Sequence, residues 1–165
     1  MSTFVSVGNA TQPFDRLLRA VCAIVAELPL PVIIQTGSAD CVCAGAVARK
    51  FVAMDEFERL IVDASLVVMH AGAGSIIHAV RAGKMPVVMP RRAKYGEHID
   101  DHQLEFARQL ARAGLVTLAE EPEDLSAAVF AALERQRSGQ ALPRSATMLQ
   151  LVNETLRSYA SGGRA

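Results

Sequence analysis

The sequence contains no tryptophan, and aromatic residues make up only 5% of its 165 residues although 51% are hydrophobic. It also has no excess of charge, since 17 lysines and arginines balance 17 aspartates and glutamates. A chain without net charge produces no overall field that would attract nucleic acid or an anionic membrane surface. The large apolar fraction and the low aromatic content suit a globular α/β domain.

Prolines or charges interrupt the longest apolar runs, so none reaches the roughly 20 residues that a membrane-spanning helix requires. The N-terminal stretch MSTFVSVGNA lacks the basic region and long apolar region of a secretory signal peptide. We therefore expect a cytoplasmic protein, in which Cys22, Cys41 and Cys43 would be reduced. Because the spacing of the last two is not that of a CxxC zinc knuckle, we interpret all three as small core or loop residues.

Apolar runs alternate with segments of helical periodicity, which predicts an α/β fold with a parallel sheet covered by helices on both faces. Asp55 is expected to cap one helix start, and Gly83 and Gly114 mark helix ends. The expected strands are 4–7, 32–36, 51–54, 66–69, 86–89 and 116–118, and the expected helices are 13–28, 55–63, 75–82, 101–113, 122–135 and 145–159. The length suits a single domain over residues 1–165, with a core of about 3–135 and a C-terminal helix of about 143–160.

Ligands bind at the carboxyl ends of the strands in such a sheet. Three polar or glycine-rich segments follow expected strands: Gly8–Thr11, His70–Ser75 and 90–103. The second segment, HAGAGS, connects a buried strand to a helix, and a glycine-rich helix N-terminus suits a phosphate group. A tight strand–helix connection without a ligand is the alternative.

The glycine turn does not fit three better-defined motifs. Ile77 stands where GxGxxG has its third glycine, and Arg92, not an acidic residue, lies about 20 residues beyond Gly72. The GxxxxGK[ST] pattern is absent, and Ala73 and Ile77 occupy the glycine positions of a nucleophile elbow around Ser75. These mismatches disfavour a dinucleotide redox enzyme and leave a phosphate-binding turn of a general type.

The second polar constellation is GEHIDDHQLE, residues 96–105. His98 and His102 have a spacing that metal ligands use, but the helix is expected to begin near Asp101, so that His98 would precede it. We favour a loop that faces a ligand, with Gln103 and Glu105 reaching sugar or ribose hydroxyls. A capped helix start exposed to solvent is the alternative.

Two cations, Arg91 and Arg92, lie at the same expected edge of the sheet, directly after Pro90. Guanidinium groups bind phosphate or carboxylate through paired hydrogen bonds. The two arginines are therefore candidate ligands for an anionic substrate, and surface arginines without a ligand are the alternative.

Three longer segments carry a family resemblance: VGNATQPFDRLLRAV, FVAMDEFERLIVDASLVVMHAGAGSIIHAVRAGKMPVVMPRR and GEHIDDHQLEFARQLARAGLV. Over residues 3–135 the sequence resembles the C-terminal, donor-binding domain of family-28 glycosyltransferases. It is most similar to small stand-alone members, which include the cytosolic subunit of the dolichol-linked N-acetylglucosaminyltransferase and the small subunits of bacterial exopolysaccharide glycosyltransferases. The combination of HAGAGS, PRR and GEHxDDHQ is more specific than the glycine turn alone.

The resemblance implies a Rossmann-like sheet, the donor-binding half of a GT-B enzyme. It implies the donor-binding, catalytic subunit of a two-subunit inverting hexosyltransferase, which transfers a sugar from a UDP-sugar to a lipid-linked glycan in bacterial exopolysaccharide synthesis. No cofactor or essential metal is implied. A membrane-anchored partner subunit would bind the lipid-linked acceptor, recruit this cytoplasmic chain to the inner face of the membrane, and be required for activity. A non-catalytic nucleotide-binding regulatory or scaffold subunit is the alternative.

Matched positions suggest how the UDP-sugar would be bound. The glycine turn would hold the diphosphate at the helix N-terminus, and the loop after the first strand would form the opposing wall. Backbone near Met54 would meet uracil, and His78 stands where a relative has an acidic residue for the ribose. Gln103, beside His102, would contact the donor sugar or ribose, and His70 would orient its loop. The expected substrate-binding residues are Gly8, Asn9, Thr11, Met54, His70, Gly72, Ala73, Gly74, Ser75, His78, Arg91, Arg92, His102 and Gln103.

Inverting transfer requires a base that deprotonates the acceptor hydroxyl and groups that stabilise the departing UDP. Glu97 and His98 are the catalytic candidates in this chain, and a base on the partner subunit is favoured over them. The donor sugar stays open between N-acetylglucosamine, glucose and glucuronate.

The C-terminal helix is a candidate docking element for the partner because it has more apolar surface than an edge helix needs. Its apolar residues are Met148, Leu149, Leu151, Val152, Leu156 and Tyr159. Ordinary core packing is the alternative.

Overall fold

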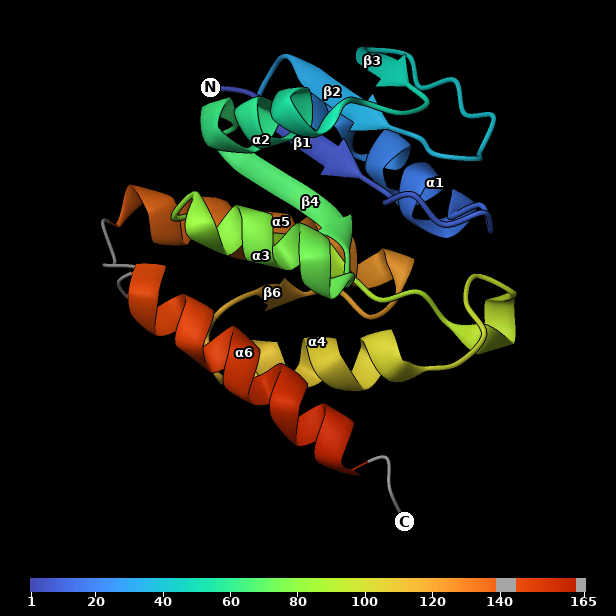
Figure 1. Cartoon of the computed structure of the whole chain (residues 1–165). Coiled ribbons are helices and arrows are strands. Elements are labelled where there is room, and N and C mark those ends of the chain that lie inside the picture. Colours follow the sequence, from blue (N-terminus) through green and yellow to red (C-terminus); the bar gives the residue numbers. More distant parts are fainter. Residues whose placement is uncertain (139–144, 163–165) are drawn as a thin grey trace.

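The computed structural model describes residues 1–138 and 145–162, with the side chains of the last helix described over 149–158. Its centre is a sheet of six parallel strands (Figure 1). The strands are β1 (Thr3–Ser6), β2 (Val32–Gln35), β3 (Ala46–Arg49), β4 (Leu66–His70), β5 (Val87–Met89) and β6 (Thr117–Leu118). Their order is β3-β2-β1-β4-β5-β6, so the chain crosses from one half of the sheet to the other between β3 and β4. This doubly wound, Rossmann-like arrangement confirms the predicted fold class.

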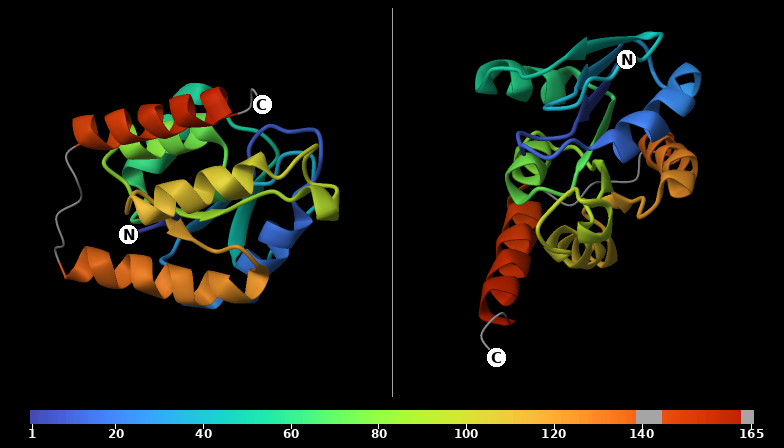
Figure 2. Two further views of the ribbon diagram at one scale, coloured as in Figure 1. Left: turned by 90° about the horizontal axis from the view of Figure 1, so that it is seen from below. Right: turned by 90° about the vertical axis from the view of Figure 1, so that its right-hand side faces the viewer.

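Helices cover both faces of the sheet (Figure 2). On one face lie α1 (Asp15–Ala23) and α5 (Leu125–Arg137), and on the other lie α2 (Met54–Asp63), α3 (Ala73–Arg81), α4 (His102–Arg112) and α6 (Ser145–Gly162). Short 3-10 helices are η1 (Val25–Glu27), η2 (Ala93–Tyr95) and η3 (Pro122–Asp124). Every expected helix is present in the structure. No helix in the described ranges is both long and apolar enough to cross a membrane.

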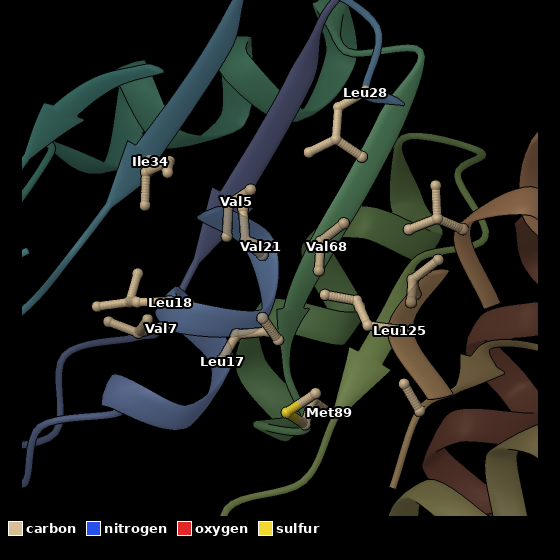
Figure 3. Packing of buried hydrophobic residues seen from close by; sticks show 14 of the residues in the cluster. Val5, Val7, Leu17, Leu18, Val21, Leu28, Ile34, Val68, Met89 and Leu125 are labelled. Atoms are coloured by element: carbon tan, nitrogen blue, oxygen red, sulfur yellow. The ribbon is translucent and has the colours of Figure 1, made fainter. Parts of the chain in front are cut away.

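Alternate residues of the buried strands supply the two sides of the core because successive strand side chains point to opposite faces. On β4, Val68 packs on the side of α1 and α5, whereas Val67 and Met69 pack on the side of α2, α3 and α4. Figure 3 shows the first side, where Leu17 of α1 and Leu125 of α5 approach the strands. Burial of one such side chain contributes about 1.5–3 kcal/mol, so the apolar strands hold both helical layers in place.

The third strand differs from the prediction. The apolar run Phe51–Met54 is not a strand, because β3 forms earlier and α2 already begins at Met54. β3 is an edge strand with mostly exposed residues, so it needs no continuous apolar sequence. Phe51 is 55% exposed in the segment that follows it. Asp55 is not the N-cap of α2 either: Ala53 occupies that position, and the Asp55 carboxylate lies 3.3 Å from Arg59.

The cysteines also differ from the prediction. Cys22 and Cys43 form a disulfide, so the expectation that all three are reduced is wrong for this structure. The connection from β2 to β3 folds against α1 and brings Cys41 close as well, with its Sγ 3.9 Å from that of Cys22. Burial raises the pKa of the Cys41 thiol. Sequence spacing gave no signal for this pairing because it depends on the path of the loop.

The C-terminal helix packs on the body of the protein. α6 lies against α3 and α4 (Figures 1 and 2), and its Val152 is fully buried. The partly buried leucines beside it are Leu149, Leu151 and Leu156. The side chains of Met148 and Tyr159 lie outside the described residues. The contacts therefore favour core packing over a free docking surface.

We expect Val152→Ala to lower the free energy of unfolding by about 2 kcal/mol, since it removes buried methyl groups and leaves a small cavity. Asn153→Ala changes the exposed neighbour on the same helix and should alter stability by no more than about 0.5 kcal/mol. Urea unfolding measures both variants. An unchanged midpoint for Val152→Ala would show that α6 is not part of the core.

Candidate functional site

A pocket of about 220 Å³ opens at the carboxyl edge of the sheet, between the ends of β1 and β4. The strand order reverses at this point, and such reversal points are where doubly wound sheets bind ligands. The pocket is lined by Gly8, Asn9, Gln35, Val52, Met54, Phe57, His70, Gly74, Ser75 and His78. It therefore brings together predicted residues from the first loop, the glycine turn and the following helices. The sequence reasoning did not single out Gln35, Val52 or Phe57 as lining residues, and Gln35 lies outside every motif.

The imidazole of His70 fills the space between two backbone loops. A Cβ atom placed on Gly8 would lie 2.5 Å from the His70 Cε1, and a Cβ on Gly72 would lie even closer to Nε2. Gly8 also has a φ of +78°, a left-handed conformation that favours glycine. The histidine ring thus excludes side chains at both positions. Gly72 is explained by its packing against His70, without a ligand contact.

His70 is held in its neutral form. Burial, and then the nearby positive charge of Arg91, lower the pKa of His70 to about 4. Its Nδ1 atom is buried and has no hydrogen-bond partner in the part of the chain that the structure describes. A neutral imidazole at the pocket wall can offer one hydrogen-bond donor or acceptor without a charge.

The first turn of α3 presents backbone N–H groups at the pocket. Gly72 is the N-cap and has no side chain to cap the helix, and the Ile76 N–H donates to the Gly72 carbonyl at 3.0 Å. The N–H groups of Ala73, Gly74 and Ser75 precede this bond and have no partner within the helix. The helix dipole adds partial positive charge at the same end. A Cβ on Gly74 would meet no atom within 4 Å, so space is open beside this residue.

Another part of the lining is apolar. Val52 comes from the segment that leads into α2, and Met54 and Phe57 come from its first turn. The ring of Phe57 meets the His78 imidazole edge-on, with centroids 5.9 Å apart and planes at 84°. The His78 Nδ1 lies 3.2 Å from the Glu58 carboxylate. Two neighbours thus hold the His78 ring at the wall of the pocket.

Arg91 does not line the pocket in the structure. Its side chain is fully buried, and its guanidinium donates to the carbonyl oxygens of Val7 (2.7 Å), Gln12 (2.9 Å) and Glu97 (3.1 Å). The guanidinium carbon lies 4.8 Å from the centre of the Phe14 ring. These carbonyls belong to the β1–α1 and β5–α4 loops, so the cation joins the two loops from the inside.

Glu97 and Arg92 belong to a network of ion pairs around Arg16. The Glu97 side chain, 5% exposed, accepts hydrogen bonds at 2.9 Å from both Nε and Nη2 of Arg16. It also accepts one from the backbone N–H of Arg92 at 3.0 Å. The Arg92 guanidinium lies 3.3 Å from the Glu121 carboxylate. Neither Glu97 nor Arg92 is among the described residues that line the pocket.

Asp100 lies between the two histidines of the loop before α4. Its Oδ1 is 3.1 Å from the His98 Nδ1, and its Oδ2 is 3.2 Å from the His102 Nδ1. The hydrogen bond from the backbone N–H of His102 is the main cause that holds the pKa of Asp100 below its usual range. His98 and His102 do not line the pocket as the structure describes it. Over residues 1–138 and 145–162, no group of three or more His, Cys, Asp or Glu side chains is placed to hold a metal ion.

Three further predicted residues lie outside the described lining. The Gln103 Oε1 accepts a hydrogen bond from the backbone N–H of Arg91 at 3.1 Å, which braces the β5–α4 loop. Thr11 is exposed, and its hydroxyl donates to Gln12 at 3.3 Å. Glu105 is exposed in the first turn of α4. None of the side chains predicted from the second polar segment, residues 96–105, is among the described residues that line the pocket.

A second, more open hollow of about 410 Å³ is lined by residues of α1 and of the η2 region, including Arg16, Arg19 and Tyr95. It does not lie at the reversal point of the sheet, and its Arg16 is already paired with Glu97. The pocket between β1 and β4 is therefore the candidate site.

A family model and a curated sequence match the chain. A family model described as the glycosyltransferase family 28 C-terminal domain matches residues 2–153. Over 49 residues the sequence is 45% identical to the UDP-N-acetylglucosamine transferase subunit ALG13 of Yarrowia lipolytica, a match that covers 30% of this chain and 23% of that protein.

Solved structures show the same fold. The calicheamicin glycosyltransferase CalG4 superposes with a TM-score of 0.67 at 17% identity, over 97% of this chain and 42% of that one. MurG of Acinetobacter baumannii gives 0.57 at 21% identity, over 92% of this chain and 45% of that one. An NMR structure of ALG13 gives 0.54 at 19% identity, over 86% of this chain and 88% of that one. The chain thus has the fold of one half of a GT-B glycosyltransferase and spans less than half of the first two proteins.

The buried imidazole predicts a pH dependence of stability. Between the ordinary histidine pKa of 6.5 and the folded value of about 4, the unfolded chain binds a proton that the folded chain does not. The contribution of the neutral His70 to the free energy of unfolding is therefore fully present above pH 6.5, and it is lost as the pH falls toward 4. From pH 7 to pH 5 we expect the wild type to lose about 2 kcal/mol more than His70→Gln. Urea unfolding at both pH values measures this, and equal losses would show that the folded state protonates His70.

The two glycines of the turn should respond differently to alanine. Gly72→Ala places a methyl group against the His70 ring and should lower the free energy of unfolding by about 1–3 kcal/mol. Gly74→Ala meets no atom and should leave stability unchanged or raise it by up to about 1 kcal/mol. In a His70→Ala background the cost of Gly72→Ala should disappear. A cost that persists in that background would mean that the ring is not what excludes the side chain.

Proposed function

The chain belongs to the glycosyltransferase family 28 C-terminal domains, and we propose that it is the donor-binding, catalytic subunit of a two-subunit inverting hexosyltransferase that uses a UDP-sugar. The observation that carries this proposal is the pocket at the reversal point of the sheet, where the uncapped start of α3 and the open space beside Gly74 meet. The pocket thus offers backbone donors for a diphosphate beside an apolar surface for a flat base, and UDP carries both groups.

The diphosphate would lie at the N-terminus of α3. The N–H groups of the first turn and the helix dipole favour an anion there. None of the described lining residues is a lysine or arginine, so backbone donors would supply most of the stabilisation from this chain. The neutral His70 would add one hydrogen bond through its ring or hold the loop in place. No cofactor or metal is required in this proposal.

The nucleoside would occupy the apolar part of the lining. Val52, Met54 and Phe57 offer surface for the flat uracil ring, and backbone near Met54 offers its polar edge. His78 stands where a relative has an acid for the ribose. Because Glu58 engages one ring nitrogen of His78, the other nitrogen is free to hydrogen-bond a ribose hydroxyl in this proposal.

A partner subunit would complete the site. The pocket volume of about 220 Å³ is below the roughly 300–1,000 Å³ of pockets that enclose a ligand, as expected where another chain supplies the second wall. We assign to that partner the membrane anchor, the lipid-linked acceptor and the catalytic base. Glu97 is a poor base because Arg16 occupies both of its oxygens, and His98 is engaged with Asp100. Recruitment of a cytoplasmic chain to the membrane, with bacterial exopolysaccharide synthesis as the setting, completes the proposal.

Calorimetry with UDP tests donor binding. We expect the wild type to bind UDP without added metal and not to bind NAD. Gly74→Ala should weaken UDP binding by about tenfold or more, because its methyl group fills the space next to the α3 N–H groups. A tenfold change corresponds to the loss of about one hydrogen bond between the protein and the diphosphate. Unchanged stability of this variant would show that the loss is local to the pocket. No UDP binding by the wild type, with or without the partner, would contradict the proposal.

Transfer by the assembled complex separates the catalytic role from a regulatory or scaffold role. If the chain holds the reacting donor, Gly74→Ala should reduce transfer in parallel with UDP affinity. If the chain only regulates or supports the partner, transfer should persist when UDP no longer binds here. Full transfer by Glu97→Gln and His98→Ala would leave the base on the partner.

A further inference from the structure

A relay of hydrogen bonds joins Gly8, Ser6, Gln35 and Asn9. It runs from the β1–α1 loop through the interior and returns to the pocket. The Gly8 N–H donates to the Ser6 Oγ at 3.2 Å, and the Ser6 hydroxyl donates to the Gln35 Oε1 at 2.7 Å. The Gln35 Nε2 then donates to the Asn9 Oδ1 at 2.9 Å. Ser6 and Gln35 are register partners at the ends of β1 and β2, and both are buried. Asn9 is exposed, and it lines the pocket together with Gln35.

The direction of this relay is fixed at its buried end. A backbone N–H can only donate, so the Ser6 oxygen accepts from Gly8, and the hydroxyl hydrogen is left for Gln35. Gln35 must then turn its oxygen toward Ser6 and its NH₂ group toward Asn9. The reverse order would leave the hydroxyl hydrogen of Ser6 buried without an acceptor, which is unfavourable.

We infer that Ser6 and Gln35 orient the side-chain amide of Asn9 so that its NH₂ group, and not its oxygen, is presented to the ligand. The Asn9 oxygen is occupied by Gln35, and the two remaining N–H donors are available on the pocket side of the side chain. Gln35 and Ser6 act through Asn9 and are positioning residues, whereas Asn9 is the group that contacts the ligand.

The orientation defines what the ligand must offer. Asn9 and the first turn of α3 both present donors to one pocket, so the group between them must carry lone pairs and need no acceptor from the protein. A phosphate oxygen of a nucleoside diphosphate meets this requirement. This step rests on the proposed function, whereas the direction of the relay does not.

Calorimetry with UDP tests the relay in the complete chain. Asn9→Ala should weaken binding about tenfold, as for one lost hydrogen bond to a charged group. Asn9→Asp should weaken it further, because its carboxylate repels the diphosphate. Gln35→Met, of similar volume, should cost nearly as much as Asn9→Ala, because Asn9 is then free to rotate. Gln109→Met, a half-buried glutamine on α4 outside the pocket lining, is the matched control and should bind as the wild type does.

The double variant separates positioning from a general structural effect. If Gln35 acts only through Asn9, adding Gln35→Met to Asn9→Ala should cause no further loss of UDP affinity. A further loss as large as in the wild-type background would overturn the relay. Asn9→Asp binding UDP as tightly as the wild type would overturn the donor role of Asn9.

NMR of the ligand-free chain tests the relay even if UDP does not bind. In ¹⁵N-labelled protein the Gln35 NH₂ signals should be protected from exchange and should shift in Asn9→Ala, while the Asn9 NH₂ signals exchange rapidly. Protected Asn9 signals, together with Gln35 signals that do not respond to Asn9→Ala, would show that the relay runs the other way. Failure of UDP binding with the expected NMR pattern would count against the proposed ligand and leave the relay intact.

Discussion

The packing of the His70 imidazole between Gly8 and Gly72 is the contact on which the candidate site depends. β1 and β4 are neighbours in the sheet, so the loops that follow them face each other across one gap. The ring fills part of that gap and sets the distance between the loops. It leaves no room for a Cβ on either glycine, yet it leaves the space beside Gly74 open. The result is a rigid wall followed by exposed backbone donors at the start of α3.

A second constraint holds the loops from the opposite side. The buried guanidinium of Arg91 satisfies carbonyls of Val7, Gln12 and Glu97, and the positive charge helps to keep His70 neutral. Removing this cation would leave carbonyls of two loops without donors in the interior. Arg91 therefore shapes the pocket without lining it. Around it, Arg16 and Glu97 fix the outer loop, which explains why charged residues so close to the site are poor candidates for direct chemistry.

Local patterns predicted the centre of the fold well. The run from Leu66 to His70, the glycines after it and the helical spacing that follows are signals within one short segment, and the structure has a strand, a turn and a helix there. β3 was misplaced because an edge strand with exposed side chains carries no apolar pattern. The Cys22–Cys43 pair was missed because it joins segments that only the loop path brings together.

The lining of the candidate pocket was predicted in part. The glycine turn and the first loop were found because their residues form a compact motif. The role of Arg91 was not predicted, because a sequence does not show whether a guanidinium binds an anion or carbonyl oxygens of the interior. Gln35 was missed because a single amide belongs to no motif. Its position offered a signal, however: Ser6 and Gln35 are polar residues at the ends of two buried strands, where an apolar residue would be expected.

The proposed function depends on the binding of a nucleoside diphosphate between the β1–α1 loop and the start of α3. NMR titration of the ¹⁵N-labelled chain with UDP tests it directly, residue by residue. We expect the largest and saturable amide shifts at Gly8, Asn9 and residues 73–75, with smaller shifts near Met54. Shifts concentrated at Arg16, Arg19 and Gly96, which line the second hollow, would contradict it.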